Sequence, residues 1–285
     1  MTHEPRRASD YDDRTTKAVK AALIELGQIL GDYLEDLVVI GGAVPWLILS
    51  SPETPHIGTI DIDLALNPAT LKNAQRYAAL VKLLEQSGYE RQLEGLEVFQ
   101  LRKMIRVDEG EPIAVTLDLL KPSRPKTKGN RPPLIPNFRV IDADGAEFAL
   151  REPKSIVLEG LMPDGRNNRV VLPVADLPSF LVMKGYALQK RDKPKDAYDV
   201  YYVVKHYPDG LEALAEVCRP FLAEKAAREG FEEIAKKFGS LNSYGADTVR
   251  DFLRDTLGSS EEIDLLHRDA YAQVNAWVRV LGLSS

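Results

Sequence analysis

Two aspartates one residue apart lie inside an apolar run, the stretch GTIDIDLAL at residues 58–66. Because side chains alternate along a strand, Asp61 and Asp63 are expected on one face, with their apolar neighbours on the other. Two carboxylates on one half-buried face repel each other, and a divalent cation is the simplest compensating partner. The alternative is a solvent-facing strand that hydrates both aspartates, or a loop in which they cap turns.

A third carboxylate follows in another strand-like run, IAVTLDLL at residues 113–120. Asp118 is expected to share its face with Thr116 and Leu120, while the alternate residues are apolar. A pattern of three carboxylates on two neighbouring strands occurs by chance much less often than a single D-x-D pair. An oxygen-only donor set suits Mg²⁺ or Mn²⁺, so the predicted metal ligands are Asp61, Asp63 and Asp118.

A pair of glycines, Gly41 and Gly42, closes the apolar run at residues 37–40, and a short helix is expected over residues 43–49. Glycines between a strand and a helix allow backbone N–H groups to approach a phosphate closely. A tight strand-to-helix turn accounts for the same pair, so the motif alone leaves both interpretations open.

One lysine interrupts an apolar stripe in the helix expected from Leu177 onward. Leu177, Leu181, Lys184 and Leu188 follow helical spacing, so Lys184 lies on the apolar face. A lysine there either has a partner or extends its ammonium group from the edge of the stripe. The next helix carries Asp196 and Asp199 on one face, flanked by Lys195. The alternative to a functional role is that these acids cap the helix N-terminus, a common arrangement.

Composition limits the class of protein. The 285 residues favour about two domains, and 44% hydrophobic with 28% charged residues is ordinary for a globular chain. The single cysteine, Cys218, excludes an internal disulfide and a cysteine-cluster metal site. No apolar run approaches the roughly 20 residues of a membrane span, and the N-terminus lacks a signal-peptide core, so a cytoplasmic protein without a membrane association is expected. A net charge of −6 disfavours a surface built mainly for nucleic acid.

The order of expected elements predicts an α+β fold with two lobes. Helices are expected over residues 16–36 and 67–88, and strands over residues 97–105 and 113–120. The first lobe is expected to span residues 1–150, with residues 1–14 disordered, and a mainly helical lobe to span residues 151–285.

The three motifs of the first lobe, VVIGGAVPWLIL, GTIDIDLAL and VTLDLL, resemble in their order the DNA polymerase β-like nucleotidyltransferase superfamily. That superfamily shows a strand, G-[GS], a helix, D-x-D and a distant third acid. The resemblance implies a lobe with a mixed sheet, in which Gly41 and Gly42 hold nucleotide phosphates. It implies that Asp61 and Asp63 bind the metals and that Asp118 takes the third metal-site or base position.

The second half resembles the C-terminal signature of the AbiEii-type, MenAT-like nucleotidyltransferase toxins, through Lys184 and the run RDKPKDAYDV. Together the resemblances cover residues 37–66, 113–120 and 174–204. They imply that Lys184 binds the triphosphate and that Asp199 or Asp196 assists catalysis or orientation, with Lys195 beside them. Thr59 matches the threonine of the family's T-x-D-x-D. The family usually shows an arginine or a similar residue before this threonine, whereas this chain has the run HIGT there.

The function implied is a metal-dependent nucleotidyltransferase that moves a nucleoside monophosphate from a nucleoside triphosphate to an acceptor hydroxyl. The family makes the tRNA 3′ end the expected acceptor and a cognate antitoxin the expected partner. The alternatives are an antibiotic-modifying nucleotidyltransferase and an inactive nucleotide-binding scaffold; the intact acid set argues against the scaffold.

A basic segment separates the two halves, and its cations occur without an intervening acid: Lys121, Arg124, Lys126, Lys128 and Arg131. Prolines and a glycine make it irregular. It is expected either to hold an RNA backbone through salt-sensitive contacts or to be a solvated loop.

Overall fold

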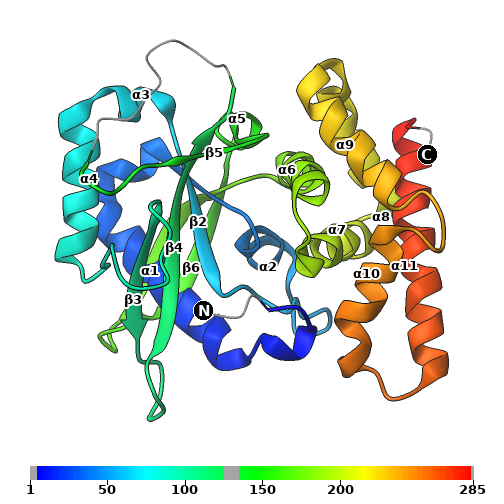
Figure 1. The fold of residues 1–285 in the computed structure, drawn as a ribbon, viewed down its shortest axis with the longest axis horizontal. Coiled ribbons are helices and arrows are strands. Elements are labelled where there is room, and N and C mark those ends of the chain that lie inside the picture. Colours follow the sequence, from blue (N-terminus) through cyan, green and yellow to red (C-terminus); the bar gives the residue numbers. More distant parts are fainter. Residues whose placement is uncertain (1–4, 125–134, 284–285) are drawn as a thin grey trace. The chain divides into compact units, whose positions relative to one another are not determined.

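The computed structural model describes residues 5–124 and 135–283. The chain divides into two compact units that alternate along the sequence. Unit 1 comprises Asp12–Val44 and Gly58–Asp176; unit 2 comprises the described residues of three segments, 5–11, Pro45–Ile57 and 177–283. Residues 45–57 therefore belong to unit 2 although unit 1 supplies the chain on either side of them (Figure 1).

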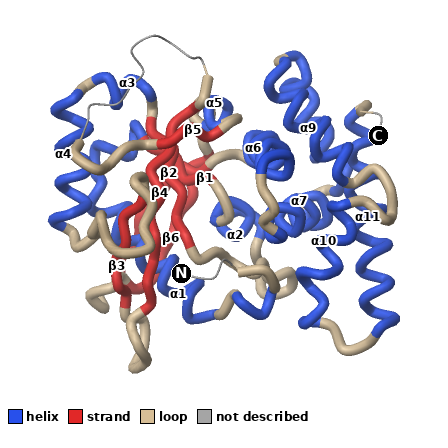
Figure 2. The backbone as a smooth tube through the Cα atoms, viewed as in Figure 1, coloured by secondary structure: helices blue, strands red, loops and turns tan. Residues whose placement is uncertain are grey.

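Unit 1 is built on a mixed sheet, drawn in red in Figure 2, and its described residues contribute seven strands in the order β3-β4-β2-β1-β7-β6, with β5 paired to β4. Strand β2 runs antiparallel to β1 and parallel to β4, and β3 runs antiparallel to β4. The strands are β1 (Leu37–Ile40), β2 (Asp61–Leu66), β3 (Gln100–Ile105), β4 (Ile113–Pro122), β5 (Ile141–Ala143), β6 (Lys154–Leu161) and β7 (Asn167–Val174).

The strands that carry the aspartates alternate as their sequence predicts. On β2, Ile62 and Leu64 are buried while Asp61 and Asp63 are partly exposed. On β4, Val115, Leu117 and Leu119 are buried, and the residues between them are partly exposed. Burial of these branched side chains, about 1.5–3 kcal/mol each, fixes which face the carboxylates occupy.

Four α-helices lie within unit 1 in the described residues: α1 (Asp13–Leu30), α3 (Pro68–Lys72), α4 (Ala74–Gln86) and α5 (Ala146–Ala149). A 3-10 helix, Gly31–Asp36, follows α1. Helix α1 buries an apolar stripe that includes Val19, Leu23 and Leu26. The single helix expected over residues 67–88 is two helices, because Asn73 leaves the helical conformation and its side chain accepts from the Arg76 N–H as a new N-cap.

The first compact unit extends past the boundary expected near residue 150. Strands β6 and β7 follow that position, and β7 joins the sheet beside β1, where the Ala175 N–H donates to the Val39 carbonyl at 2.9 Å. Near the N-terminus, where disorder to residue 14 is expected, Ala8–Asp10 form a 3-10 helix in unit 2, and Ala8 is buried. Residues 1–4 lie outside the described residues.

Unit 2 is helical in its described part. Its α-helices are α6 (Leu177–Lys190), α7 (Pro194–His206), α8 (Gly210–Cys218), α9 (Lys225–Lys237), α10 (Tyr244–Leu253) and α11 (Ser260–Leu281). Helix α2 (Ala43–Leu49) begins in unit 1 and continues into unit 2. Helices α6 and α9 approach so closely that a Cβ atom at Gly185 would lie 1.8 Å from the Gly230 carbonyl oxygen. Trp277 is fully buried, as expected of a core residue.

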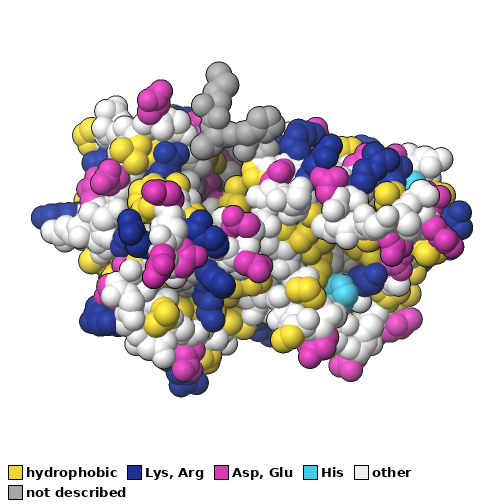
Figure 3. All heavy atoms as spheres, turned by 90° about the horizontal axis from the view of Figure 1, so that it is seen from below, with side chains coloured by type: hydrophobic (Ala, Val, Ile, Leu, Met, Phe, Trp, Pro, Cys, Tyr) yellow, Lys and Arg dark blue, Asp and Glu magenta, His cyan; other side chains and the backbone are white. Residues whose placement is uncertain are grey.

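Acidic and basic side chains are interspersed on the molecular face shown in Figure 3. Among the described residues, no helix combines the length and apolar character needed to cross a membrane.

Candidate active site

The three predicted carboxylates lie on one face of two paired strands in unit 1. Strands β2 and β4 are parallel neighbours, and their register places Asp63 directly beside Asp118 and Asp61 beside Thr116. Neighbouring strands are about 5 Å apart, so the sheet brings together residues that are far apart in sequence. The structure thus gathers Asp61, Asp63 and Asp118 as the sequence pattern predicts.

Gly41 leaves room for Asp63. It follows β1, whose Ile40 is paired with Asp63, and it has a positive φ of +70°. A Cβ atom at Gly41 would lie 1.8 Å from Oδ2 of Asp63, a distance at which one of the two residues has to move. The glycine is therefore needed for the close approach to the carboxylate, in addition to any contact with a phosphate.

The structure predicts a specific effect for Gly41→Ala. The left-handed backbone alone costs about 1–2 kcal/mol of unfolding free energy. The new methyl group also displaces the Asp63 carboxylate, so Gly41→Ala should lose catalytic activity in addition to stability. Gly165→Ala is the matched control, because Gly165 has φ +82° and open space around its Cβ position. Urea denaturation and transfer assays on both variants separate the terms; equal activity in the two variants would contradict the steric role.

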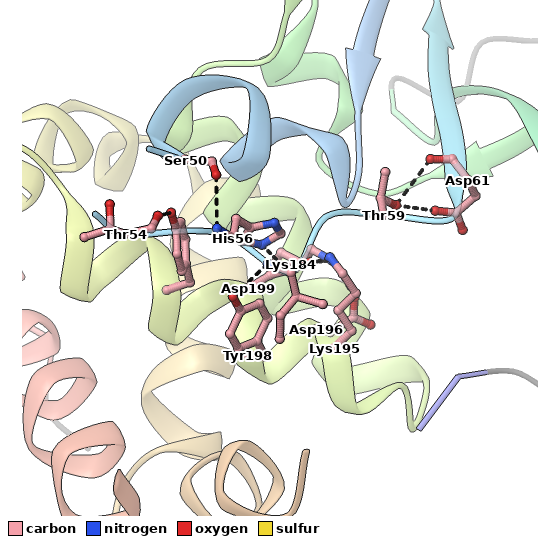
Figure 4. Close-up of polar contacts among 12 residues, drawn as sticks. Ser50, Thr54, His56, Thr59, Asp61, Lys184, Lys195, Asp196, Tyr198 and Asp199 are labelled. Carbon is pink, nitrogen blue, oxygen red and sulfur yellow. Dashed lines mark hydrogen bonds and ion pairs between the residues drawn. The ribbon is translucent and has the colours of Figure 1, made fainter. Parts of the chain in front are cut away.

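Hydrogen bonds orient the other two carboxylates. The Thr59 hydroxyl donates to Asp61 Oδ1 at 2.7 Å, and its oxygen also lies 3.3 Å from the Asp61 carbonyl (Figure 4). Thr59 is 2% exposed, so its hydroxyl is held beside Asp61. Gln100 Nε2 on β3 donates to Asp118 Oδ1 at 2.9 Å. Sequence reasoning missed Gln100, because only the pairing of β3 with β4 reveals that the two residues are neighbours.

The donor chemistry of this face fits a hard divalent cation. Carboxylate oxygens from neighbouring strands are ligands that Mg²⁺ accepts, with water and substrate oxygens completing the shell. Within residues 5–124 and 135–283, no three or more His, Cys, Asp or Glu side chains are already arranged to hold a metal ion. Asp61, Asp63 and Asp118 remain the residues whose chemistry and position suit one.

A second cluster of charged residues lies inside unit 2, between α6 and α7. Lys184 Nζ lies 2.6 Å from Asp196 Oδ1 and 2.8 Å from Asp199 Oδ2. Lys195 Nζ lies 2.7 Å from Asp199 Oδ1, and Arg191 Nε lies 2.7 Å from Asp196 Oδ2. Three cations therefore surround two carboxylates. Lys184 has partners, as a lysine on an apolar face requires.

The cations of this cluster keep both aspartates ionised. Burial alone would raise the pKa of Asp196, but the charges and hydrogen bonds of Lys184 and Arg191 lower it to about 2. Burial opposes ionisation of Asp199 in the same way, and Lys184, Lys195 and His56 hold its pKa well below the ordinary range. Burial alone would lower the pKa of Lys184, yet Asp196 and Asp199 raise it above its ordinary value.

His56 joins the cluster from the segment that links the two parts of unit 1. Its Nε2 lies 3.1 Å from Asp199 Oδ1, its side chain is fully buried, and its ring contacts Tyr198 and Tyr202. The segment is fixed further where the Tyr202 hydroxyl donates to the Thr54 carbonyl at 2.6 Å. Sequence reasoning missed His56, because 143 residues separate it from Asp199 and no spacing links them.

The buried state of His56 predicts how stability depends on pH. Burial, reinforced by the charge of Lys195, lowers the pKa of His56 from 6.5 to about 4, so the folded protein binds fewer protons than the unfolded chain between these values. Stability should therefore fall as pH drops from 6.5 toward 4, by roughly 3 kcal/mol from this residue. Urea denaturation at several pH values should show a flatter dependence for His56→Gln than for wild type; parallel curves would contradict the assignment.

The basic segment is only partly described. Lys121 lies in β4, and its ammonium group pairs with the Asp142 carboxylate. Lys126, Lys128 and Arg131 lie outside the described residues, so the expected RNA-binding role of the segment stays a prediction.

One family model matches most of the chain. The family model described as nucleotidyl transferase AbiEii toxin, type IV TA system, matches residues 58–273. This chain belongs to the AbiEii family. The match contains the predicted aspartates and Lys184, whereas Gly41, Gly42 and His56 precede it. Membership of the AbiEii family identifies the chain as a nucleotidyltransferase toxin, and the name of its model indicates a partner antitoxin.

Two solved structures show low similarity to this AbiEii-family chain. MenT4, a nucleotidyltransferase toxin from Mycobacterium tuberculosis H37Rv, is 13% identical with a TM-score of 0.42, over 98% of this chain and 99% of that one. An antigenic nucleotidyltransferase-like protein from Paracoccidioides brasiliensis is 19% identical with a TM-score of 0.40, over 77% and 94%. No curated protein matches the sequence.

Proposed function

We propose that the protein transfers a nucleoside monophosphate from a nucleoside triphosphate to the 3′ end of a tRNA, and that this reaction is its toxic activity. The observation that carries the proposal is the placement of three carboxylates on one face of β2 and β4, on strands that the AbiEii family model matches. A cognate antitoxin would counteract this activity, as the type IV toxin–antitoxin description of the family indicates.

In this proposal, Asp61, Asp63 and Asp118 hold Mg²⁺ or Mn²⁺. When bound, the metal supplies positive charge that stabilises the attacking and leaving oxygens of an in-line displacement releasing pyrophosphate. Thr59 keeps Asp61 in position through the hydrogen bond to Oδ1. The turn at Gly41 and Gly42 brings backbone N–H groups to the nucleotide phosphates while leaving room for Asp63.

The charged cluster of unit 2 contributes cations in the same proposal. Lys184 and Lys195 are proposed to attract the triphosphate, with Asp196 and Asp199 orienting their ammonium groups. The cluster has three cations against two carboxylates, and His56 is neutral at pH 7 because its pKa is about 4. The ammonium groups of Lys184 and Lys195 favour an anionic ligand. Asp199 is proposed to assist by holding both lysines at once.

The test incubates the protein with total RNA, each labelled nucleoside triphosphate in turn, and Mg²⁺, with a parallel reaction in EDTA. Label in tRNA-sized bands that disappears with EDTA is the expected result. Label only in small molecules would identify an antibiotic-modifying type of transferase. Absence of label with all four nucleotides would contradict the proposed function, and transfer that persists in EDTA would contradict the metal assignment.

A further inference from the structure

The sheet of unit 1 places an arginine in line with the carboxylates. Strand β3 pairs with β4, and its register sets Gln100 beside Asp118 and Arg102 beside Thr116. Because Thr116 is in turn the neighbour of Asp61, a row of side chains crosses three strands from Asp61 through Thr116 to Arg102. With strands about 5 Å apart, the Cα atoms of Arg102 and Asp61 are roughly 10 Å apart.

Arg102 lies on the same face as the carboxylates. The hydrogen bond from Gln100 to Asp118 shows which face of β3 the even-numbered residues occupy. The alternate residues lie on the other face: Leu101 and Ile105 are buried, and Lys103 Nζ bonds to Glu25 of α1 at 2.6 Å. Arg102 therefore faces the space above Thr116, next to the predicted metal ligands.

The Nε atom of the Arg102 guanidinium group has no hydrogen-bond partner among the described residues. This atom is shielded from solvent and makes no hydrogen bond within residues 5–124 and 135–283. Glu90 on the neighbouring segment is joined to Arg102 by two backbone hydrogen bonds, and its side chain is exposed. Arg14 and Arg76 of the same unit, in contrast, each bind a carboxylate. A shielded donor without an acceptor is costly unless a ligand supplies one.

We propose that Arg102 binds a phosphate group of the acceptor nucleic acid. The strand order β1-β2-β4-β3 places Gly41, next to β1, and Arg102, on β3, on opposite sides of the aspartates. An in-line displacement needs the attacking and leaving oxygens on opposite sides of the phosphorus. If the triphosphate lies toward Gly41, the acceptor lies toward Arg102. The inference rests on the proposed function and adds where the acceptor binds.

The chemistry of this position favours a nucleic acid over a small cationic acceptor. A guanidinium group matches phosphate oxygens with two parallel hydrogen bonds, and it repels a polycationic molecule. Met104, two residues further along the same face of β3, is 57% exposed and offers an apolar contact beside the arginine. A phosphate next to the accepting 3′ hydroxyl would accept hydrogen bonds from Arg102, and the neighbouring ribose or base would pack against Met104.

The test compares wild type with Arg102→Met, Arg102→Lys and the control Arg169→Met, which removes an exposed arginine from β7 of the same unit. Binding of unfractionated tRNA should weaken roughly tenfold to a hundredfold in Arg102→Met, partly recover in Arg102→Lys, and stay unchanged in the control. The slope of log affinity against log salt should fall by about 0.7 in Arg102→Met alone, the value for one lost phosphate contact with a single strand. Affinity for non-hydrolysable triphosphate analogues with Mg²⁺ should stay within about twofold of wild type.

Equal tRNA affinity and salt slope in Arg102→Met and wild type would overturn the proposal, and so would a loss of analogue affinity in place of tRNA affinity. If Arg102→Met loses its native thermal transition, Arg102→Gln replaces it, and unfolding of both would make Arg102 a structural residue. The binding measurements are independent of turnover. A wild-type protein that binds tRNA through Arg102 but transfers no nucleotide would contradict the proposed function and leave this inference standing.

Discussion

Asp61→Asn and Asp63→Asn are each expected to lower the transfer rate by more than about a hundredfold, a larger effect than the 10–100-fold typical of residues that only support a metal ligand. The reason is that each change removes a charged oxygen donor from the face shared by β2 and β4. Stability without metal should stay the same or rise, because the change relieves repulsion between neighbouring carboxylates. Transfer assays and thermal unfolding in EDTA measure the two effects.

Asp164→Asn is the control for these variants. Asp164 lies at the exposed turn between β6 and β7, where it pairs with Arg166, so its loss should leave transfer unchanged. Partial activity together with a large loss of metal-free stability in Asp61→Asn or Asp63→Asn would show that these aspartates are structural residues and not metal ligands.

Lys184→Met is expected to cost about 3–5 kcal/mol of unfolding free energy, because it leaves Asp196 and Asp199 buried with less compensating charge. The sequence alone leads to a different expectation, since methionine keeps the apolar packing of the lysine stem and the helix should then survive. The structure changes this expectation because Lys184 is 6% exposed and bridges two carboxylates. Urea denaturation at pH 7 measures the loss.

Two further variants locate the cause of that loss. Lys190→Met removes an exposed lysine from the end of the same helix and should cost little. The double change Lys184→Met with Asp196→Asn removes one cation and one anion, so it should recover a substantial part of the lost stability. A single variant as stable as wild type would contradict the ion-pair role. Triphosphate binding by the double variant then tests whether Lys184 also serves the nucleotide.

Local periodicity was sufficient to predict the elements that carry the chemistry. The two-residue alternation around Asp61 and Asp118 predicts strands with one polar face, and the stripe through Lys184 predicts its helix; the structure confirms all three. These features depend on neighbours within about ten residues, where side-chain direction follows directly from backbone geometry. The AbiEii resemblance is confirmed by the family model for the same reason, because its motifs are short and local.

Pairing over long sequence separations could not be predicted in this way. Gln100 and Arg102 join the carboxylate face only through the register of β3 on β4, and a shift of one residue would turn both to the opposite face. Strands β6 and β7 belong to the sheet because β7 pairs with β1, which lies about 130 residues earlier in the chain. His56 likewise depends on a partner that no local pattern near residue 56 reveals.

The placement of residues 45–57 in unit 2 has a consequence for synthesis of the protein on the ribosome. Asp199 follows His56 by 143 residues, so at 5–20 residues per second it is made about 7–30 seconds later. During that interval the strands on either side of the segment can pair, while the segment itself still lacks the helix against which it folds. A nascent chain that stops before α7 carries the three aspartates of the sheet but neither Asp196 nor Asp199 for Lys184, so the charged cluster of unit 2 is completed only late in translation.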